Sequence, residues 1–372
     1  MKWQGNKIKQ LAGDNKLSLS KLSEMVKVSR QTVNGWISGK MPKGNHLIKL
    51  CNTLNVSPDY FFSETDHTIT VPVHRTRRKA KVTQKTQKDA FNLAKEYSHL
   101  FRNDHHSGIY PVVRTETTDI ECAKKIARTL RDMAEVPKDS PLGYQHIFLL
   151  MKKLGIKVIF RYFPETIKAY AFYTKICGHR VTFVNNHTNT LDLIFPLIHE
   201  AVHAIRDEIQ INEMFDQNEE QFCDDVANYV QFPDAYIKMI YDAIRCLSDP
   251  GHKIKILKTF AQNNGHSLYG VIKRIQTIDS EFNLKIGGAD TNLKKQFKTI
   301  GERLFENSEV QPFLKKIKEW SPLFVDTVIQ QSNDISTRKL GELFGLQGYL
   351  DADALKKEIM LIRSGDIHVY TL

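Results

Sequence analysis

The sequence contains few cysteines, and they are not arranged as a disulfide framework or as a metal site. There are five, an odd number, and they are widely spaced without a Cys-x-x-Cys pair. This pattern excludes a disulfide-rich secreted fold and a cysteine-ligated zinc site, and it favours the reducing cytoplasm. The sequence also lacks the run of roughly 18 apolar residues that a membrane span needs, and its polar start lacks the apolar core of a signal peptide. We therefore expect a cytoplasmic protein with no membrane partner.

The sequence has fewer acidic than basic residues, and the excess of basic residues is concentrated near the N-terminus. The 372 residues carry a formal net charge of +11. Residues 1–65 contain 10 Lys/Arg against 4 Asp/Glu, and residues 74–88 contain 7 Lys/Arg and no acid. A basic patch confined to one end of a chain is typical of nucleic-acid binding rather than of a uniformly basic surface. At this length, with 41% hydrophobic and 26% charged residues, the chain can form two or three globular domains.

Hydrophobic periodicity divides the chain into a helical first part, a mixed central part and a helical last part. We predict an all-α domain over residues 1–65, a basic linker over 66–86, an α+β domain with a small sheet over 87–248 and a helical region over 249–372. The fold class is therefore multidomain and mainly α. The linker is either a solvated tether or a basic arm that contacts DNA phosphate.

The first domain and the sheet can be divided further. Helices of the first domain are expected at residues 6–15, 21–26, 30–37, 46–54 and 58–62. Strands are expected at residues 155–163, 167–174 and 180–185, the last two forming a hairpin.

Residues 18–62 read SLSKLSEMVKVSRQTVNGWISGKMPKGNHLIKLCNTLNVSPDYFF, and this segment resembles the Cro/Xre-type helix-turn-helix repressors. The resemblance implies that one helix crosses the DNA backbone and the next lies in the major groove. Arg can read guanine there, and Gln or Asn can read adenine. The groove-facing positions are Arg30, Gln31 and Asn34, and the positions near phosphates are Lys21, Lys40 and Lys43.

Lys27 departs from the family pattern, which usually has glycine in the turn before the recognition helix. A left-handed conformation at a lysine costs on the order of 1 kcal/mol. Val33 and Trp36 face away from the groove and are expected in the core. The resemblance implies double-stranded DNA as a partner and a homodimer on paired half-sites. The alternative is a helix-turn-helix fold used only for protein contact.

A second motif, HExxH, lies within LDLIFPLIHEAVHAIRD at residues 191–207. His199 and His203 are four residues apart, so both imidazoles lie on one helix face and can reach one zinc ion. Glu200 follows the first histidine and can act as the general base of a metallopeptidase. Apolar neighbours predict that the helix is largely buried. The alternative interpretation is two buried histidines bonded to the backbone.

The next acidic helix, at residues 218–233, offers two candidates for the third ligand that a zinc site needs. Glu220 and Asp224 are four residues apart and share a face. HExxH followed by an acid three residues before Ala-Asn is similar to the ImmA/IrrE zinc metallopeptidases, as are the upstream strands and residues 335–346. The resemblance implies a zincin-like peptidase domain with Asp224 as the third ligand, although residues 229–233 depart from the family pattern. The alternative is that Glu220 binds the metal and Asp224 orients a histidine.

Proteins of the resembled family cut a partner transcriptional repressor and so release genes. By resemblance, we expect a DNA-binding zinc endopeptidase with a repressor as its protein substrate. One alternative is a DNA-binding transcriptional regulator with a structural or inactive metal site, and another is an antitoxin-like protein that binds partners through residues 249–372. Residues 339–346 repeat the pattern of residues 21–28, but Asp351 and Asp353 would repel phosphate, which favours a packing or protein-contact role there.

Overall fold

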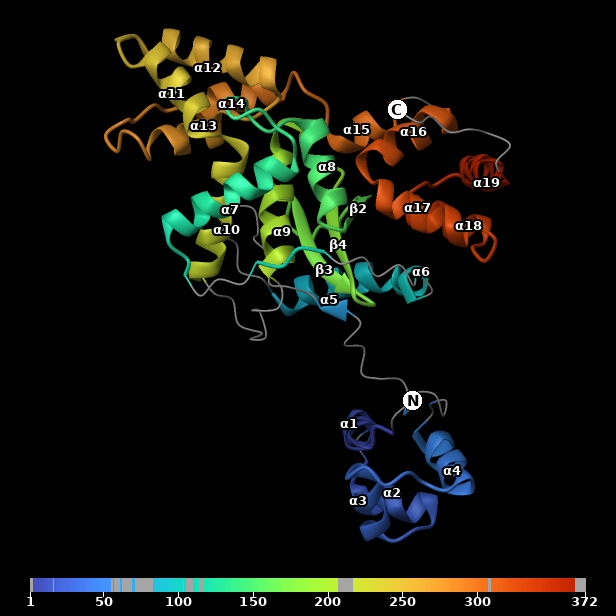
Figure 1. The fold of residues 1–372 in the computed structure, drawn as a ribbon. Coiled ribbons are helices and arrows are strands. Elements are labelled where there is room, and N and C mark those ends of the chain that lie inside the picture. Colours follow the sequence, from blue (N-terminus) through green and yellow to red (C-terminus); the bar gives the residue numbers. More distant parts are fainter. Residues whose placement is uncertain are drawn as a thin grey trace. The chain divides into compact units, whose positions relative to one another are not determined.

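The computed structural model describes residues 3–15, 17–54, 56, 61, 69–70, 83–102, 104, 110–113, 117–206, 217–306 and 309–364. The chain forms two compact units, Met1–His67 and Thr68–Leu372 (Figure 1). The hydrophobic core of the first unit is separate from those of the second. The predicted domain boundaries stay predictions, because the structure divides the chain only into these two units. Among the described residues, no helix has the length and apolar composition that a membrane crossing requires.

The first unit is a small helical domain whose helices begin at capping residues that the sequence supplies. Ser18 and Ser29 each accept a hydrogen bond from the backbone N–H three residues further on. Lys27 lies between the second and third helices in the left-handed conformation, with φ of 61°. The predicted helix at 58–62 lies outside the described residues, apart from Phe61. The described helices are α1 (Asn6–Asp14), α2 (Leu19–Val26), α3 (Arg30–Ile37) and α4 (Gly44–Leu54).

The second unit is built on a small mixed sheet with the strand order β1-β3-β4-β2. β3 and β4 form the predicted antiparallel hairpin, and its turn residues Cys177 and Gly178 both have positive φ. β2 pairs with β4 in parallel, and β1 pairs with the end of β3. The strands are β1 (Ile69–Thr70), β2 (Ile156–Arg161), β3 (Ala171–Ile176) and β4 (His179–Asn185).

Two details of the sheet differ from the prediction. The strand predicted at 167–174 begins only at Ala171. Ile167 and Ala169 are buried and Lys168 is exposed, so the segment alternates like a strand, but it has no partner in the ladder. Within the predicted linker, Ile69 and Thr70 form a short strand beside Ile176 and Lys175.

Helices cover the sheet and place the candidate site. α9 (Ile194–Arg206) packs against β3, and α10 (Gln217–Gln231) packs against both α9 and α7 (Ile120–Met133), as Figure 1 shows. A short 3-10 helix, η3 (Thr190–Asp192), leads into α9. The remaining helices before α9 are α5 (Gln84–Lys95), α6 (Ser98–Arg102) and α8 (Tyr144–Lys153).

The helices after α10 divide into two groups according to the hydrophobic cluster to which they belong. The first group has its own hydrophobic cluster, and the second packs against the main core that contains the sheet. The Asn189 side chain joins the first group to the start of α9 by donating to the carbonyls of Lys294 and Phe297, at 2.9 Å each. The first group is α11 (Asp234–Ile244), α12 (Pro250–Asn264), α13 (Leu268–Ile275) and α14 (Gly287–Lys294). The second is α15 (Ile300–Leu304), α16 (Val310–Trp320), α17 (Pro322–Gln331), α18 (Thr337–Phe344) and α19 (Tyr349–Ser364).

Candidate metal centre and DNA-binding surface

The two histidines of HExxH lie on the buried face of α9, one turn apart. His199 is 2% exposed and His203 is 5% exposed. Their Nε2 atoms are 3.1 Å apart, and the rings meet edge to face. Because α9 is apolar along most of its length and packs between β3 and α10, the helix fixes both imidazoles toward the same point.

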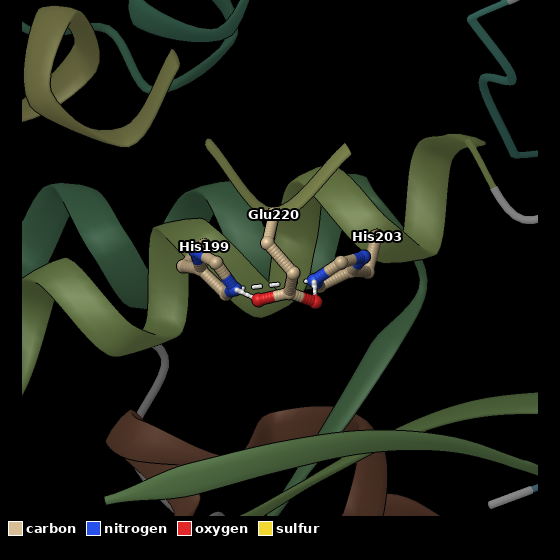
Figure 2. A group of neighbouring side chains, drawn as sticks. All are labelled: His199, His203 and Glu220. Atoms are coloured by element: carbon tan, nitrogen blue, oxygen red, sulfur yellow. Dashed lines mark hydrogen bonds and ion pairs between the residues drawn. The ribbon is translucent and has the colours of Figure 1, made fainter. Parts of the chain in front are cut away.

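Glu220 of α10 brings a carboxylate to that point, as Figure 2 shows. Its Oε2 lies 3.3 Å from His199 Nε2, and its Oε1 lies 3.2 Å from His203 Nε2. Atoms bonded to one tetrahedral zinc at about 2.0–2.1 Å lie roughly 3.3 Å from each other. The two imidazole nitrogens and the carboxylate therefore fit a zinc ion in both donor type and spacing.

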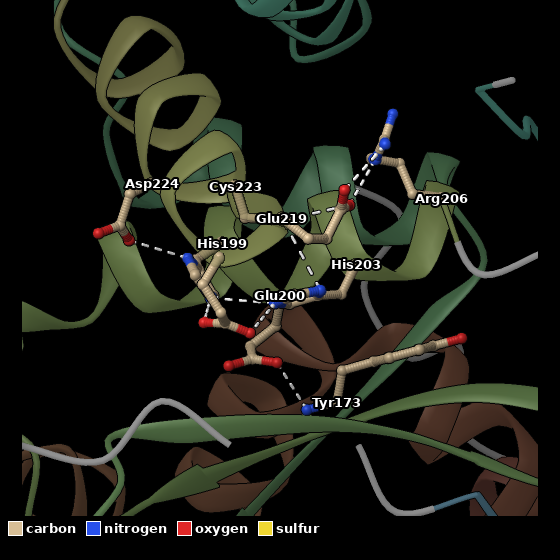
Figure 3. A network of polar contacts seen from close by, with 9 residues as sticks. Tyr173, His199, Glu200, His203, Arg206, Glu219, Cys223 and Asp224 are labelled. Carbon is tan, nitrogen blue, oxygen red and sulfur yellow. Dashed lines mark hydrogen bonds and ion pairs between the residues drawn. The ribbon is translucent and has the colours of Figure 1, made fainter. Parts of the chain in front are cut away.

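Asp224 lies one turn further along α10 and contacts the other nitrogen of the first histidine (Figure 3). Its Oδ1 is 3.0 Å from His199 Nδ1, and its Oδ2 is 3.7 Å from Lys273 Nζ. An aspartate beside Nδ1 can orient the imidazole without binding the ion held at Nε2. The geometry therefore favours Glu220 as the third ligand, where the family resemblance implies Asp224.

The carboxylate of Glu200 points toward β3, where it meets the backbone of Tyr173 (Figure 3). Its Oε2 accepts a hydrogen bond of 2.8 Å from the backbone N–H of Tyr173 on β3. Burial raises the pKa of this carboxyl, against the opposing effect of the two histidines. A raised pKa brings Glu200 closer to the range in which a carboxylate can both take and return a proton.

The histidines and acids of the cluster shift one another's pKa values. Burial lowers the pKa of His199, but hydrogen bonds to Asp224 and Glu220 outweigh it and raise the pKa to about 10. Burial likewise raises the pKa of Glu220, and its hydrogen bonds to His199 and His203 outweigh that effect and lower it. Protons and a divalent cation would therefore compete for the same place.

Three further residues lie beside the cluster, and the sequence motif carried no signal for them: Cys223, Arg206 and Glu219. Cys223 Sγ lies 3.6 Å from His203 Nδ1. Arg206, only 2% exposed, donates from its Nη2 to Glu219 Oε2 at 2.9 Å. These contacts hold the end of α9 against the start of α10, close to the candidate metal ligands.

A cavity of about 340 Å³ lies beside the cluster and reaches His199 and Glu200. Its walls come from the segment before α9, from α9 and α10, and from helices α13 and α14. The lining combines apolar side chains, among them Leu191 and Phe195, with the polar side chains of Asn228, Lys273 and Lys294.

In the first unit, all six predicted DNA-contacting residues are exposed, whereas Val33 and Trp36 are buried in the core. Arg30, Gln31 and Asn34 belong to the recognition helix α3, and Lys21 belongs to α2. Lys40 and Lys43 lie in the connection between α3 and α4. Side chains that would read bases thus share one helix, and lysines that would contact phosphates flank it.

Comparison with known proteins gives a match in the first unit of the chain. No curated protein matches the chain. Residues 8–61 match the helix-turn-helix family model, and the match does not extend into the second unit. The N-terminal unit is therefore a Cro/Xre-type helix-turn-helix domain, which indicates a DNA-binding regulator.

Proposed function

We propose that this protein is a DNA-binding zinc endopeptidase that cleaves a partner transcriptional repressor and so derepresses genes. The observation that carries the proposal is the approach of His199, His203 and Glu220 to one point, with Glu200 and a cavity beside it. Zincin peptidases need this combination, because a metal alone does not provide the proton transfer. The helix-turn-helix domain would bring the peptidase to DNA, where repressors are bound.

Zinc held by the two imidazoles and Glu220 would supply Lewis-acid polarisation and acidify a water molecule. Glu200 accepts the proton of the attacking water and passes it to the leaving amine. The hydrogen bond from Tyr173 N–H holds one oxygen of Glu200 against β3. The carboxylate of Asp224, whose Oδ1 lies 3.0 Å from His199 Nδ1, favours the tautomer with the hydrogen on Nδ1, which keeps Nε2 available as a ligand.

A second candidate function is a DNA-binding transcriptional regulator whose metal site is structural or inactive. The deep burial of the two histidines favours it. Structural zinc sites usually have four protein ligands, however, whereas three groups meet here among the described residues. Three ligands leave a position for water or substrate, which supports the peptidase.

The test separates metal binding from catalysis. Glu200→Gln should retain about one zinc per chain, because Glu200 is not a ligand, and should lower cleavage of a co-expressed candidate repressor by about 10²–10⁴-fold. His203→Ala should lose both zinc and cleavage. Zinc is measured by elemental analysis and cleavage by mass spectrometry of the repressor.

The outcomes distinguish the two functions. If zinc-loaded wild type leaves every candidate repressor intact, and Glu200→Gln retains the regulatory phenotype, the peptidase proposal fails and the regulator is favoured. If no zinc is found in the wild type, both forms of the metal-site proposal fail.

A further inference from the structure

One face of α10 carries three polar residues spaced one turn apart: Glu220, Asp224 and Asn228. The first two are explained by their contacts with the histidines. Asn228 is only 4% exposed, and its Oδ1 is fully buried without a hydrogen-bond partner among the described residues. A buried carbonyl without a partner is costly in a folded protein, and such groups usually bond to water or to a ligand.

Asn228 lines the cavity that also reaches His199 and Glu200. The two lysines that line this cavity are each paired with aspartates. Lys294 Nζ lies 2.8 Å from Asp192 and 2.7 Å from Asp290. Lys273 and Asp224 form the other pair. Asn228 also lines the cavity, but its Oδ1 has no hydrogen-bond partner among the described residues. Its carboxamide is therefore available to bind a ligand.

The same cavity is also lined by apolar side chains. Leu191, Phe195 and Pro196 come from η3 and the first turn of α9, and Ala171 begins β3. A volume of about 340 Å³ is at the small end of the range for ligand pockets, so it suits a short peptide segment and not a folded domain. The ion pair between Lys294 and Asp192 joins α14 to η3 at the wall of the cavity.

We propose that this cavity binds the substrate peptide next to the cleaved bond, with Asn228 hydrogen-bonded to a main-chain peptide group. An apolar side chain of the substrate would pack against Leu191, Phe195 and Pro196. A peptide group carries one donor and one acceptor, so it pairs with a carboxamide in either orientation of the amide. The inference rests on the proposed peptidase function, and it gives the helices α13 and α14 a role in substrate binding.

The test compares two probes of zinc-loaded protein by calorimetry. Acetohydroxamate binds metal alone, and an N-acetyl dileucyl hydroxamate adds a short apolar peptide. Wild type should bind the dileucyl probe at least about 10-fold more tightly. Asn228→Ala should weaken the dileucyl probe by about 3- to 10-fold, which is the effect of one hydrogen bond, and leave acetohydroxamate unchanged.

Gln221→Ala is the matched control, because it removes a carboxamide from the exposed side of the same helix, where it bonds to Asp225. It should leave both affinities unchanged. The Tm of Asn228→Ala without probe should be unchanged or raised, since the variant removes a polar group without a partner. A structural asparagine would instead lower the Tm.

Two results would overturn the inference. One is an unchanged affinity of Asn228→Ala for the dileucyl probe, and the other is no gain of the dileucyl probe over acetohydroxamate in the wild type. If acetohydroxamate does not bind wild type, the proposed metal function fails separately. The cavity is then tested with N-acetyl dileucyl amide, which has no metal-binding group. It should bind wild type more tightly than Asn228→Ala, and equal affinities would overturn the inference.

Discussion

Each imidazole of the candidate metal centre has a polar side chain beside both of its nitrogens. Glu220 faces the Nε2 atoms of His199 and His203, while Asp224 and Cys223 lie beside the two Nδ1 atoms. With a metal bound at Nε2, the carboxylate of Asp224 beside Nδ1 of His199 favours the tautomer in which Nδ1 carries the hydrogen. Ligand and orienting residue can therefore be told apart by mutation.

We expect Glu220→Gln to weaken zinc binding more than Asp224→Asn does. Loss of an orienting carboxylate typically reduces metal affinity by about 10–100-fold, whereas Glu220→Gln removes a charged ligand. Competition with a fluorescent chelator measures both affinities. The reverse order would identify Asp224 as the ligand, as the family resemblance implies.

His266 is a buried neutral histidine that should make stability depend on pH. Its Nδ1 lies 3.1 Å from the carbonyl of Ser267, and its Nε2 lies 2.7 Å from the hydroxyl of Tyr236. The carbonyl requires a hydrogen on Nδ1, so Nε2 accepts from Tyr236 and the neutral ring is satisfied. Burial lowers the pKa of His266 from 6.5 to about 4.

Because the folded-state pKa of His266 is depressed, the unfolded chain binds a proton more readily. The stability it contributes at neutral pH is lost as the pH falls from about 6.5 toward 4, by about 2 kcal/mol between pH 7 and pH 5. Urea unfolding of wild type and His266→Gln at both pH values measures the difference. Equal pH dependence in the two proteins would contradict this account.

Lys27 should be a site at which glycine stabilises the first unit. Lys27 has φ of 61° and ψ of 50°, which L-residues with a side chain adopt at a cost. Lys27→Gly should raise the free energy of unfolding by about 1 kcal/mol. Lys49→Gly is the control, since Lys49 is exposed within α4, and it should lower the same free energy by about 1 kcal/mol. Loss of stability in both would show that the left-handed turn is unstrained.

The helices α2 and α18 share one local arrangement, which the repeated sequence pattern anticipates. Ser18 and Ser336 cap them by accepting from Lys21 N–H and Lys339 N–H. Each helix ends at a left-handed residue, Lys27 in one and Gly345 in the other. The helix after each of them differs, because α3 presents Arg30 and Asn34, whereas Asp351 lies in the first turn of α19. Leu340, Leu343 and Phe344 of α18 are buried, in line with a packing role, and a protein-contact role for this segment stays a prediction.

Substitutions on and beside α3 should separate base reading from phosphate binding. Arg30→Ala and Asn34→Ala should each cost about 1–3 kcal/mol on the preferred sequence and relax specificity. Lys43→Ala should weaken binding to all sequences alike and reduce the salt slope by about 1. Fluorescence anisotropy with a duplex selected from a random library, at several salt concentrations, measures both. Equal losses on selected and random duplexes for Arg30→Ala would contradict base reading.

The elements that the sequence predicted well are those with local signals. The Ser29 cap places the start of α3 at Arg30, as predicted. Burial in a loop misled the prediction at Ile167 and Ala169, because alternation does not reveal whether a partner strand is present. The choice between Glu220 and Asp224 depends on side-chain reach toward α9 rather than on helix spacing, which both satisfy. The cavity that Asn228 lines could not be predicted, because its walls come from α9, α10, α13 and α14, which are far apart in the sequence.

The whole molecule consists of two units with separate cores, which should unfold separately. We expect two transitions in scanning calorimetry of the full chain. Lys27→Gly should shift only the transition of the first unit, and His266→Gln only that of the second. Matching shifts in both transitions would show that the two units unfold as one.

The shared face of α10 also limits how the chain can change in length. Glu220, Asp224 and Asn228 are in register with α9 only while the count of residues between them is kept. Inserting or deleting a single residue there would rotate everything beyond it by about 100°, so Asn228 would leave the cavity while Glu220 kept its place. Homologous chains that keep both the candidate metal centre and the cavity asparagine should therefore accept insertions in the connections around α10 but not within α10.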